Sequence, residues 1–448
     1  MTKKVVIVGA GPSGLLLAHY LLRRDKPGTA CAKSDRKYQI EIYERRADPR
    51  LVSFPKYRTY SLALSPRGIN ALSHIPGLEE AVRAVSVEVS GTIIHQKNGK
   101  TVFRRIRTPQ LTLDRTNLAI AILQKLVSSY DSSGVKIHFD SKCTGVDFAN
   151  KIVKFENNST GQTEFKNVNY DLLIGADGAS SAVREELLNT DGFESQQKYF
   201  YKDYKSIFIS PPDPKLKLHL QPSNLHSWRL RLNNATNLLL LYQLDGSWSG
   251  VINFPHGKNQ IAELCSKQKV LQYFQENFPE IAGAIAEEEA EAFASRPISR
   301  VVSVSCNRYH HGDSVLIIGD AAHAVPPSIG QGCNSALEDV VVFDRLLDEY
   351  SDNLVEALEQ FTVRRRPDAY ALLELSNYTL PLSQKLFIEF LVRTSFAKLM
   401  HKIFPKRFQP FLFDLITEST IPYSEILKTY QKWINKVKKT NEKFLGTI

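Results

Sequence analysis

The sequence predicts an α/β fold: a nucleotide-binding unit that is discontinuous along the chain, an inserted β-sheet domain and a helical C-terminal region. Three observations predict it. Apolar strands run directly into glycine-containing turns and then into helices at three widely separated places, around Gly9, Gly175 and Gly319. Between residues 191 and 299 the pattern changes to irregular strands. After about residue 355 it becomes helical.

The composition is typical of a globular protein, with 43% hydrophobic and 23% charged residues in a chain of 448. The five cysteines are scattered and never spaced as Cys-x-x-Cys. This argues against a disulfide framework or a zinc site and favours a reducing, cytoplasmic compartment. The chain enters a strand soon after Met1, so no cleavable signal is expected. No apolar run reaches the roughly 18 residues that cross a bilayer, and the nearest candidates, Leu15–Leu22 and Leu386–Val392, predict buried helices.

The charge is unevenly distributed. The net charge is +10, and +7 of it falls between residues 385 and 448, where there are twelve Lys and Arg and five Asp and Glu. A basic tail can bind nucleic acid or an anionic membrane surface, or it can be a solvated helix face. No nucleic-acid motif accompanies the charge, so no nucleic-acid partner is predicted, and peripheral membrane contact stays open.

The first part of the chain predicts alternating strands and helices. Residues 3–22 predict a strand, a tight turn and a helix, and Gln39–Glu44 predicts the next strand after a polar insert. Residues 60–86 predict a short strand followed by helices. Alternating apolar residues on both sides of Asn98-Gly99 predict a hairpin, and Asp114 is the candidate N-cap of the helix that follows.

The rest of the chain predicts more strands and then helices. Strands are expected within residues 136–157 and 171–175, and one helix is expected near residues 268–290. The irregular strands of the inserted domain are expected at Lys205–Ser210, Leu225–Leu232, Asn237–Leu244 and Gly250–Phe254. The final helical region is interrupted at Pro381, Pro405, Pro410 and Pro422.

The first chemistry-bearing motif is VVIVGAGPSG, at the first of these turns. Gly9 permits the tight turn, Gly11 lets the backbone approach a pyrophosphate, and Gly14 lets the next helix pack closely against the sheet. The helix N-terminus then binds the phosphate charge. Glu44 follows the second strand, about ten residues later than is usual, and is a candidate acceptor for a ribose hydroxyl. The alternative is a solvated strand end.

The second motif is DLLIGADGASSAVR. It places Asp177 at the carboxyl end of a buried strand, where ligands bind in such sheets. Gly178 relieves the turn, and Arg184 supplies a cation one or two helical turns further on. Asp177 could equally be the N-cap of the next helix.

The third motif is GDAAHAVPPSIGQGCN. Asp320 follows a buried strand and is suited to accept hydrogen bonds from ribityl hydroxyls. The loop from Gly330 to Asn334 exposes backbone N–H groups at a helix start. Such groups would stabilise the pyrimidine edge of an isoalloxazine ring, which becomes anionic on reduction. A structural role is favoured for His323 over acid–base catalysis.

In this order and spacing the three motifs resemble those of the class A FAD-dependent aromatic monooxygenases, and within that class the chain is most similar to the kynurenine 3-monooxygenase family. The similarity is clearest at Tyr60–Leu72, Leu113–Leu118, Arg364–Ser376 and the three motifs themselves. It implies a GR2-type Rossmann-like FAD-binding domain, a β-sheet substrate domain and a helical C-terminal region in a soluble or peripheral protein. The implied ranges are 1–75, 110–190 and 300–360 for FAD binding, 76–109 and 191–299 for the substrate domain, and 361–448 for the helical region.

The resemblance also implies cofactors and site residues. FAD would be the resident cofactor, with NAD(P)H as a transient co-substrate, and O2 and a small aromatic compound as substrates. No metal and no certain catalytic side chain are implied. The residues expected at FAD or NAD(P)H are Gly9, Gly11, Pro12, Ser13, Gly14, Glu44, Arg45, Arg58, Arg115, Asp177, Asp320, Pro327, Gly330, Gly332, Cys333 and Asn334.

The substrate site departs from the family pattern. Kynurenine-specific enzymes hold the amino-acid carboxylate with an arginine and a tyrosine on the hairpin, where this chain has Thr92 and Ile106. The paired phenylalanines before Gly-Gln-Gly are replaced by Ser328 and Ile329. The remaining expected substrate contacts are Asn377 and Tyr423, and the same hairpin offers another clamp or a solvated edge through Arg104, Arg105 and Arg107.

The sequence therefore predicts an FAD-dependent, NAD(P)H-consuming monooxygenase that hydroxylates a small aromatic substrate, either kynurenine or another aromatic compound. The main alternative is a flavin-dependent reductase or dehydrogenase that inserts no oxygen. A flavin-bearing scaffold attached to membranes by its basic tail is a third hypothesis. A flavin halogenase is disfavoured because no Trp-x-Trp-x-Ile-Pro run is present.

Overall fold

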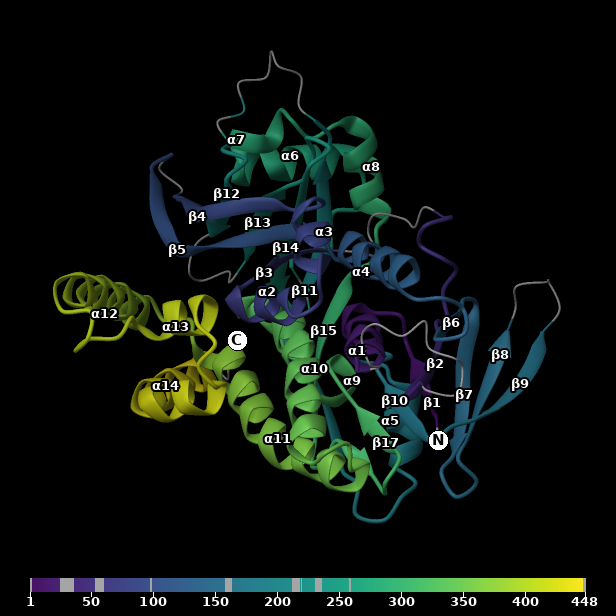
Figure 1. Cartoon of the computed structure of the whole chain (residues 1–448). Helices are drawn as coiled ribbons and strands as arrows, with labels where there is room; N and C mark the ends of the chain where they lie inside the picture. The colour runs from purple at the N-terminus through teal and green to yellow at the C-terminus, as the bar shows by residue number, and fades with distance from the viewer. Residues whose placement is uncertain are drawn as a thin grey trace.

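The computed structural model describes residues 2–24, 36–52, 60–96, 99–157, 163–211, 218, 220–229, 236–257 and 259–445. Within these ranges the chain forms a six-stranded, an eight-stranded and a three-stranded sheet. Figure 1 shows the helices of the C-terminal region packed to one side of the two larger sheets. The α/β character and the second sheet predicted from the sequence are confirmed.

The six-stranded sheet has the order β16-β17-β10-β1-β2-β6. All neighbours pair in parallel except β16 and β17. The central strands are continuous apolar runs, as expected for parallel strands that are covered on both faces. Because the strands are parallel, the turns after β1, β10 and β17 all lie at the same edge of the sheet. The bounds are β1 Lys3–Val8, β2 Tyr38–Tyr43, β6 Val135–His138, β10 Leu172–Gly175, β16 His310–His311 and β17 Val315–Ile317.

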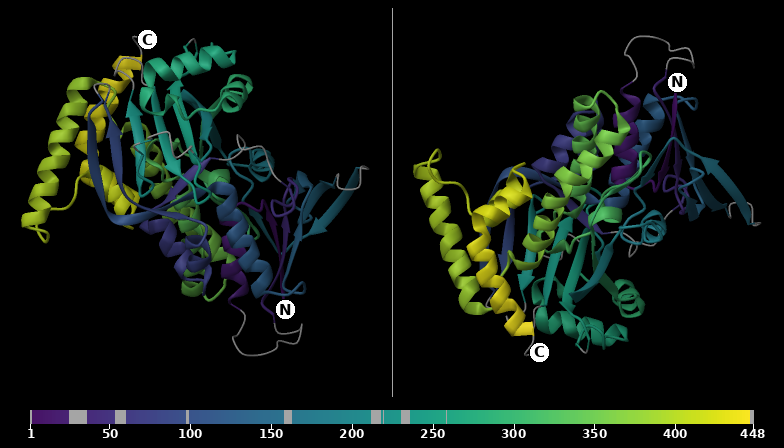
Figure 2. Two further views of the ribbon diagram at one scale, coloured as in Figure 1. Left: turned by 90° about the horizontal axis from the view of Figure 1, so that it is seen from above. Right: turned by 90° about the horizontal axis from the view of Figure 1, so that it is seen from below.

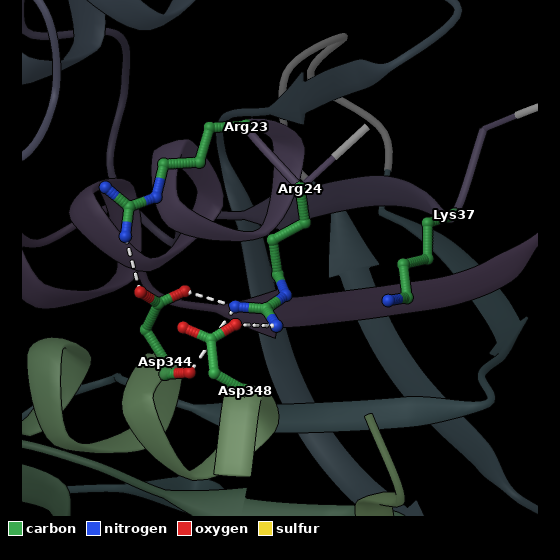
Figure 3. A pocket seen from close by; sticks show the side chains of 5 residues that line it. All are labelled: Arg23, Arg24, Lys37, Asp344 and Asp348. Carbon is green, nitrogen blue, oxygen red and sulfur yellow. Dashed lines mark hydrogen bonds and ion pairs between the residues drawn. The ribbon is translucent and has the colours of Figure 1, made fainter. Parts of the chain in front are cut away.

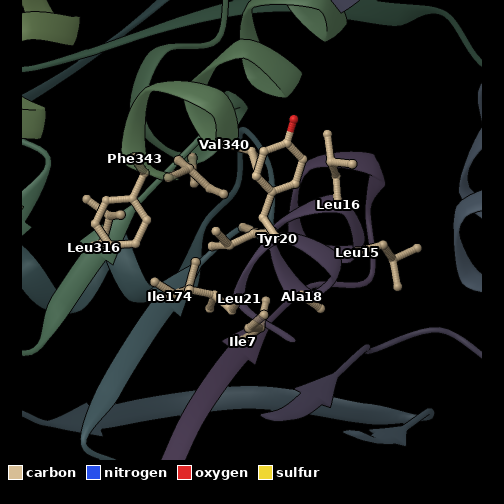
Figure 4. Close-up of a cluster of buried hydrophobic side chains, with 14 of the residues drawn as sticks. Ile7, Leu15, Leu16, Ala18, Tyr20, Leu21, Ile174, Leu316, Val340 and Phe343 are labelled. Atoms are coloured by element: carbon tan, nitrogen blue, oxygen red, sulfur yellow. The ribbon is translucent and has the colours of Figure 1, made fainter. Parts of the chain in front are cut away.

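Helices α1 (Pro12–Leu22) and α10 (Gly332–Glu349) pack against this sheet. Every residue of α1 is buried, which confirms the buried helix predicted for Leu15–Leu22. In Figure 4, Tyr20 and Leu21 of α1 lie in one apolar cluster with side chains of β1, β10, β17 and α10. The other helices packed near this sheet are α4 (Arg115–Ser129), α5 (Ala182–Leu187) and α9 (Asp320–His323).

The C-terminal ends of α1 and α10 are joined by ion pairs. Asp344 of α10 bonds Arg23 and Arg24, and Nη2 of Arg24 also bonds Asp348. Lys37 bonds Asp352 beside them. A surface hollow is lined by Arg23, Arg24, Lys37, Asp344 and Asp348 (Figure 3), and Asp344 itself is largely shielded from solvent. The cluster therefore ties the two helices together at the ends remote from their N-termini.

The eight-stranded sheet has the order β15-β11-β14-β13-β12-β4-β5-β3. The predicted hairpin is present, with His95 opposite Thr101, and Asp114 caps α4 by accepting a hydrogen bond from the backbone N–H of Thr116. The strands are β3 Ser61–Leu64, β4 Val87–His95, β5 Thr101–Asp114, β11 Ser195–Ile209, β12 Asn224–Arg229, β13 Asn237–Tyr242, β14 Trp248–Pro255 and β15 Ser299–Cys306.

One face of this sheet packs on three helices. They are α6 (Lys267–Asn277), α7 (Pro279–Ala282) and α8 (Glu287–Ser295). The single helix predicted near residues 268–290 is therefore wrong. The chain leaves the helical region at Phe278, whose φ and ψ are −141° and 54°, and Pro279 then starts a new helix at its N1 position.

The remaining elements are two helices that follow β3 and a small third sheet. Helices α2 (Pro66–Ser73) and α3 (Leu78–Arg83) follow β3, as predicted for residues 60–86. The small antiparallel sheet has the order β7-β8-β9, with bounds Ser141–Asp147, Ile152–Asn157 and Glu164–Asn169. Because β3 and β15 pair in the eight-stranded sheet, these two segments join the second sheet rather than the first. The division into domains otherwise stays a prediction.

The C-terminal region consists of α11 (Leu354–Tyr378), α12 (Gln384–Ile403), α13 (Leu412–Glu418) and α14 (Tyr423–Leu445), with an apolar core of its own. The breaks between these four helices fall at the prolines predicted to interrupt the region, Pro381, Pro405, Pro410 and Pro422. The buried helix predicted for Leu386–Val392 is only half correct. Leu386 and Phe390 are buried, whereas the other side of α12 is exposed to solvent. In Figure 2, α12 forms the outer edge of the C-terminal region.

Candidate active site

The three glycine-containing turns contact one another at the carboxyl edge of the six-stranded sheet. A Cβ at Gly9 would lie 2.5 Å from the carbonyl oxygen of Ala176, beside Asp177 in the second turn. A Cβ at Gly319, in the third turn, would lie 3.1 Å from Oγ of Ser13 in the first. Both glycines have positive φ, 105° and 60°. The convergence expected from the sequence is therefore present, and glycine is required where the turns meet.

The N-terminus of α1 is suited to an anion. No side chain caps this helix, Pro12 occupies its first turn, and a Cβ at Gly11 would meet only the Ala176 carbonyl, at 3.9 Å. The backbone there is open to a close approach, and its N–H groups and dipole favour phosphate.

Arg115 supplies a cation near this turn. Its guanidinium carbon lies 5.9 Å from the ring centre of Tyr60, and no carboxylate of the described residues lies within ion-pair distance. The pKa of Arg115 is raised, first by Tyr60 and then, against the opposing effect of burial, by Asp320, Cys333 and Glu44. A half-buried guanidinium without a carboxylate partner fits the negative charge of a dinucleotide.

Glu44 lies directly after β2, and its carboxylate bonds the first turn. One oxygen accepts from the N–H of Ala10 and the other from the N–H of Arg46, both at 3.0 Å. Each carboxylate oxygen can accept a further hydrogen bond, so the predicted ribose contact is compatible with this geometry. Arg45 next to it is exposed, and the predicted residue Arg58 lies outside the described residues.

One carboxylate oxygen of Asp177 accepts a hydrogen bond, and the other has no partner among the described residues. Oδ2 accepts from the N–H of Ala182 at 2.7 Å, whereas Oδ1 is buried and has no partner among the described residues. Burial raises the pKa of this carboxyl. The N-cap of α5 is Ser181, so Asp177 supports the helix start without being its cap. An unpartnered buried oxygen fits a ligand that donates a hydrogen bond.

Arg184 does not supply a cation to the site. It is fully buried, and its guanidinium donates to the carbonyl oxygens of Ala321 at 2.9 Å and Ala179 at 2.7 Å. It therefore joins the second turn to the third.

A buried polar network supports the third turn. Oδ2 of Asp339 accepts from the backbone N–H of Gly319 and bonds Nε2 of His323, both at 2.7 Å, and Oδ1 accepts from Nε of Arg365 at 2.8 Å. Burial raises the pKa of Asp339, but His323 and Arg365 lower it more, so it is held below its usual value. His323 is thus engaged inside the protein, which supports a structural role, while Asp320 remains half-buried at the turn.

The loop before α10 is held by the side chain of Asn334, which lies in the first turn of α10. It contains a 3-10 turn, Pro327–Ile329, and then Gly330 with φ 68°. Nδ2 of Asn334 donates to the carbonyl oxygens of Ala63 and Gly330, both at 3.0 Å, and Oδ1 accepts from the N–H of Ser65 at 2.8 Å. The amide group of Asn334 therefore shapes the loop and is engaged within the protein.

Two predicted substrate residues also bond this loop. Oγ of Ser328 donates to the carbonyl oxygen of Ser376 at 2.5 Å, and the hydroxyl of Tyr423 donates to Oε1 of Gln331 at 3.0 Å. Ile329 is buried in the apolar core of the C-terminal helices. Asn377 is half-buried in the last turn of α11.

Burial raises the pKa of the Cys333 thiol to about 12, so this residue stays a neutral thiol in the loop. Sequence reasoning missed two residues of the site: Tyr60 beside Arg115, and Ser65, whose hydroxyl bonds Gln331 of the predicted loop. The Ser-Pro pair at the start of α2 was the available signal for Ser65.

The hairpin carries Thr92 and Ile106 on its surface facing the C-terminal region. Thr92 is half-buried and pairs with Arg104, and Ile106 is buried. Arg104 forms an ion pair with Asp414 of α13, and its guanidinium lies 4.2 Å above the ring of Phe413. Arg107 bonds Glu418 through its backbone N–H, at 3.0 Å. Both arginines are therefore engaged by carboxylates of α13.

The fold and the converging turns define the class of flavin-dependent enzymes in which the nucleotide-binding sheet is joined to a second, larger sheet. Residues 77–376 match the family model described as FAD binding domain. Among curated proteins, the chain is 31% identical to the kynurenine 3-monooxygenase of Phaeosphaeria nodorum, over 96% of this chain and 89% of the relative. It is 30% identical to that of Flavobacterium psychrophilum, over 95% and 91%. The chain belongs to the kynurenine 3-monooxygenase family of FAD-dependent aromatic monooxygenases.

Solved structures agree on the fold. The tetrameric form of 2-methyl-3-hydroxypyridine-5-carboxylic acid oxygenase superposes with a TM-score of 0.66 at 20% identity, covering 84% of this chain and 90% of that one. PqsL of Pseudomonas aeruginosa, in complex with 2-aminobenzoylacetate, gives 0.66 at 19% identity, covering 88% and 100%.

The protein is thus an FAD-dependent monooxygenase that uses NAD(P)H and O2 and acts on a small aromatic substrate. Bound FAD supplies the hydride-accepting and oxygen-activating chemistry. Around the converging turns the chain presents an uncapped helix start, a half-buried guanidinium, carboxylate oxygens and a loop at the start of α10 that is held by hydrogen bonds. In the described part of the chain, no helix is both long and apolar enough to span a membrane.

Proposed function

We propose that this enzyme hydroxylates a small aromatic compound that is not held through a carboxylate on the β4–β5 hairpin. The curated relatives are named for kynurenine, which carries an amino-acid carboxylate. The resemblance places the family's carboxylate-binding arginine and tyrosine at Thr92 and Ile106, and neither residue here carries a charge. The single observation that carries the proposal is that Arg104 and Arg107 of the same hairpin are already paired with carboxylates of α13.

Arg104 and Arg107 do not replace the missing clamp. The side chain of Asp414 is fully buried, and it is neutralised by Arg104 and, at 3.5 Å, by Lys398. Diverting Arg104 to a substrate would weaken the neutralisation of a buried carboxylate, and breaking such a pair costs about 3–5 kcal/mol. Arg107 is engaged by Glu418, whose side chain is also nearly buried.

The carboxylates of α13 already occupy the cations of this surface. Asp414 pairs with Arg104 and Lys398, and Glu418 pairs with Arg107. Burial, and then the nearby charge of Asp414, raise the pKa of Glu418. A substrate carboxylate would have to displace one of these pairs, whereas a neutral aromatic ketone, amide or heterocycle would not.

A pair of matched ligands tests the proposal. 2-Aminoacetophenone has the 2-aminophenyl ketone of L-kynurenine without its amino-acid group. The dissociation constants of both are measured from the flavin spectrum, together with stimulated NADPH oxidation and hydroxylated product. We expect the ketone to bind at least as tightly as kynurenine. A Thr92→Arg variant should shift the preference toward kynurenine, by roughly 10-fold or more for a charge-assisted hydrogen bond of about 1.5–3 kcal/mol. Tighter binding of kynurenine by the unmodified enzyme would refute the proposal.

FAD is proposed to occupy the converging turns. The support is the open N-terminus of α1, the partly buried Arg115 and the unpartnered Oδ1 of Asp177. The groups proposed to hold it belong to Gly9, Gly11, Pro12, Ser13, Gly14, Glu44, Arg45, Arg115, Asp177, Asp320, Pro327, Gly330, Gly332, Cys333 and Asn334.

A second function, peripheral attachment to an anionic membrane, is favoured by α12. The side of this helix that faces away from the protein is exposed and apolar, with exposed fractions of 62% for Val392 and 60% for Phe396. Four exposed cations lie on or just after the helix, and none forms an ion pair within the described residues. The apolar residues are Ile388, Leu391, Val392, Phe396, Leu399, Ile403 and Phe404, and the cations are Lys385, Lys402, Lys406 and Arg407.

An apolar strip with uncompensated positive charge matches the interface of a bilayer that contains anionic lipids. A second copy of this chain matches it less well. Antiparallel contact of two α12 helices would bring Lys385 of one copy to Lys402 of the other, and parallel contact would bring equal cations together. We therefore propose that α12 lies in the plane of the membrane surface, on the cytoplasmic side.

Cosedimentation with vesicles tests this attachment. Binding to phosphatidylserine-containing vesicles should exceed binding to pure phosphatidylcholine vesicles and should fall with added salt. Val392→Glu should weaken it, whereas Val363→Glu, a change at a valine of α11 that is 55% exposed, should not. Equal binding by the two variants, or self-association through α12 without vesicle binding, would contradict the assignment.

A further inference from the structure

The last long helix reaches the loop at the start of α10. Tyr423, the first residue of α14, is fully buried, and its hydroxyl donates to Oε1 of Gln331 at 3.0 Å. The Oγ of Ser65, at the start of α2, donates to the same oxygen at 3.3 Å. One glutamine oxygen therefore receives a hydroxyl from each of two elements that are distant in sequence.

Gln331 occupies the N-cap position of α10, but its side chain does not cap the helix. The first N–H groups of a helix have no partner within the helix, and their direction follows from the backbone of the cap residue. Here those groups belong to Gly332, Cys333 and Asn334. By fixing the Gln331 side chain from two sides, Tyr423 and Ser65 restrict how these N–H groups are oriented.

The ring of Tyr423 is itself fixed. The guanidinium of Arg67 lies 4.0 Å from its centre and is held by Glu338 and by the carbonyl oxygen of Ile421 at 2.6 Å. The next residue, Ser424, donates its hydroxyl to Oδ1 of Asp368 at 2.5 Å. The hydroxyl of Tyr423 is thus presented to Gln331 by a rigid surrounding.

We propose that Tyr423 is a positioning residue through which the C-terminal helix sets the N-terminus of α10 against the pyrimidine edge of the flavin. This inference rests on the proposed FAD site. It assigns Tyr423 to the flavin rather than to the substrate, because its hydroxyl is already donated to Gln331. The readiness of the flavin to accept hydride then depends on a contact made by the C-terminal region.

Tyr423→Phe tests the proposal because it removes only the hydroxyl and keeps the ring beneath Arg67. The variant should bind FAD normally, have a more negative flavin midpoint potential than the wild type, and show roughly tenfold slower substrate-stimulated flavin reduction, the effect that one hydrogen bond can have. Ser65→Ala, which removes the other donor, should change the potential in the same direction.

Tyr430→Phe is the matched control. Tyr430 lies on the same helix, and its hydroxyl donates to the carbonyl oxygen of Pro410 at 3.0 Å, away from the loop. Its loss should change thermal stability about as much as Tyr423→Phe does, with an unchanged potential.

Equal potentials and reduction rates in the two tyrosine variants would overturn the proposal. So would a weaker binding constant for the aromatic substrate with an unchanged flavin potential, since that result marks a substrate contact. If the wild-type protein binds no FAD, it is the proposed cofactor site that fails, which distinguishes the two failures.

Discussion

Gly319→Ala should weaken FAD binding and destabilise the protein, because Gly319 lies where the first and third turns meet. Its φ of 60° and ψ of −141° fall in a region that is open essentially to glycine alone, and occupying it with another residue costs of order 1–3 kcal/mol. The added Cβ would also lie 3.1 Å from Oγ of Ser13 and from Cβ of Ala336. The turns must therefore separate by a few tenths of an ångström.

The loss in FAD affinity follows from that separation. If it weakens one or two hydrogen bonds to the cofactor, a change of about 1–3 kcal/mol lowers the affinity roughly 5- to 150-fold. Fluorescence titration of the apo-protein with FAD measures the affinity, and urea unfolding measures the stability.

Gly312→Ala provides the comparison. Gly312 also has positive φ, 54°, but a Cβ there meets nothing within 4 Å. That variant should lose only about 1 kcal/mol of stability and keep its FAD affinity. The reasoning is refuted if Gly319→Ala binds FAD as tightly as Gly312→Ala does.

Three further predictions concern the cofactor, the buried network and pH. Asp320→Ala should purify largely without FAD, seen as a low ratio of flavin to protein absorbance, and full flavin content would contradict the role of Asp320. Asp339→Asn should lower the free energy of unfolding by about 3–5 kcal/mol because it leaves Arg365 and His323 less compensated. Asp348→Asn, at a side chain that is 68% exposed, should change it by less than about 1 kcal/mol in the same urea titration. Burial lowers the pKa of His95 and His226 to about 4. The unfolded chain therefore takes up protons below about pH 6.5 that the folded protein refuses. The urea midpoint should fall between pH 7 and pH 5, and a pH-independent midpoint would be the contrary result.

Sequence reasoning identified the features that are local in the chain. The turns at Gly9, Asp177 and Gly319 and the cap at Asp114 each depend on a strand, a small residue and a helix within about a dozen positions. The hairpin and the proline breaks of the C-terminal region were found for the same reason. Local patterns of this kind are decided by backbone geometry.

Contacts between distant segments were not accessible in this way. Arg184 suggested a cation for a ligand, but its guanidinium is used by Ala321, which is 137 residues away. Tyr423 suggested a substrate contact, but it bonds Gln331, 92 residues away. The exposure of α12 was missed because an apolar run alone does not show whether a neighbour covers each side.

The charge cluster between the far ends of α1 and α10 has a consequence for engineering. Both helices start at the proposed dinucleotide site, and acidic groups near the C-terminus of α10 would be unfavourable there without the guanidinium groups that follow α1. Because α1 and α10 are joined at their C-terminal ends, a change in the angle between the two helices changes the distance between their N-terminal ends. Replacing Arg24 with a shorter cationic residue should therefore change the affinity for the cofactor from the far ends of the two helices. The substitution would alter no atom that is proposed to contact the cofactor.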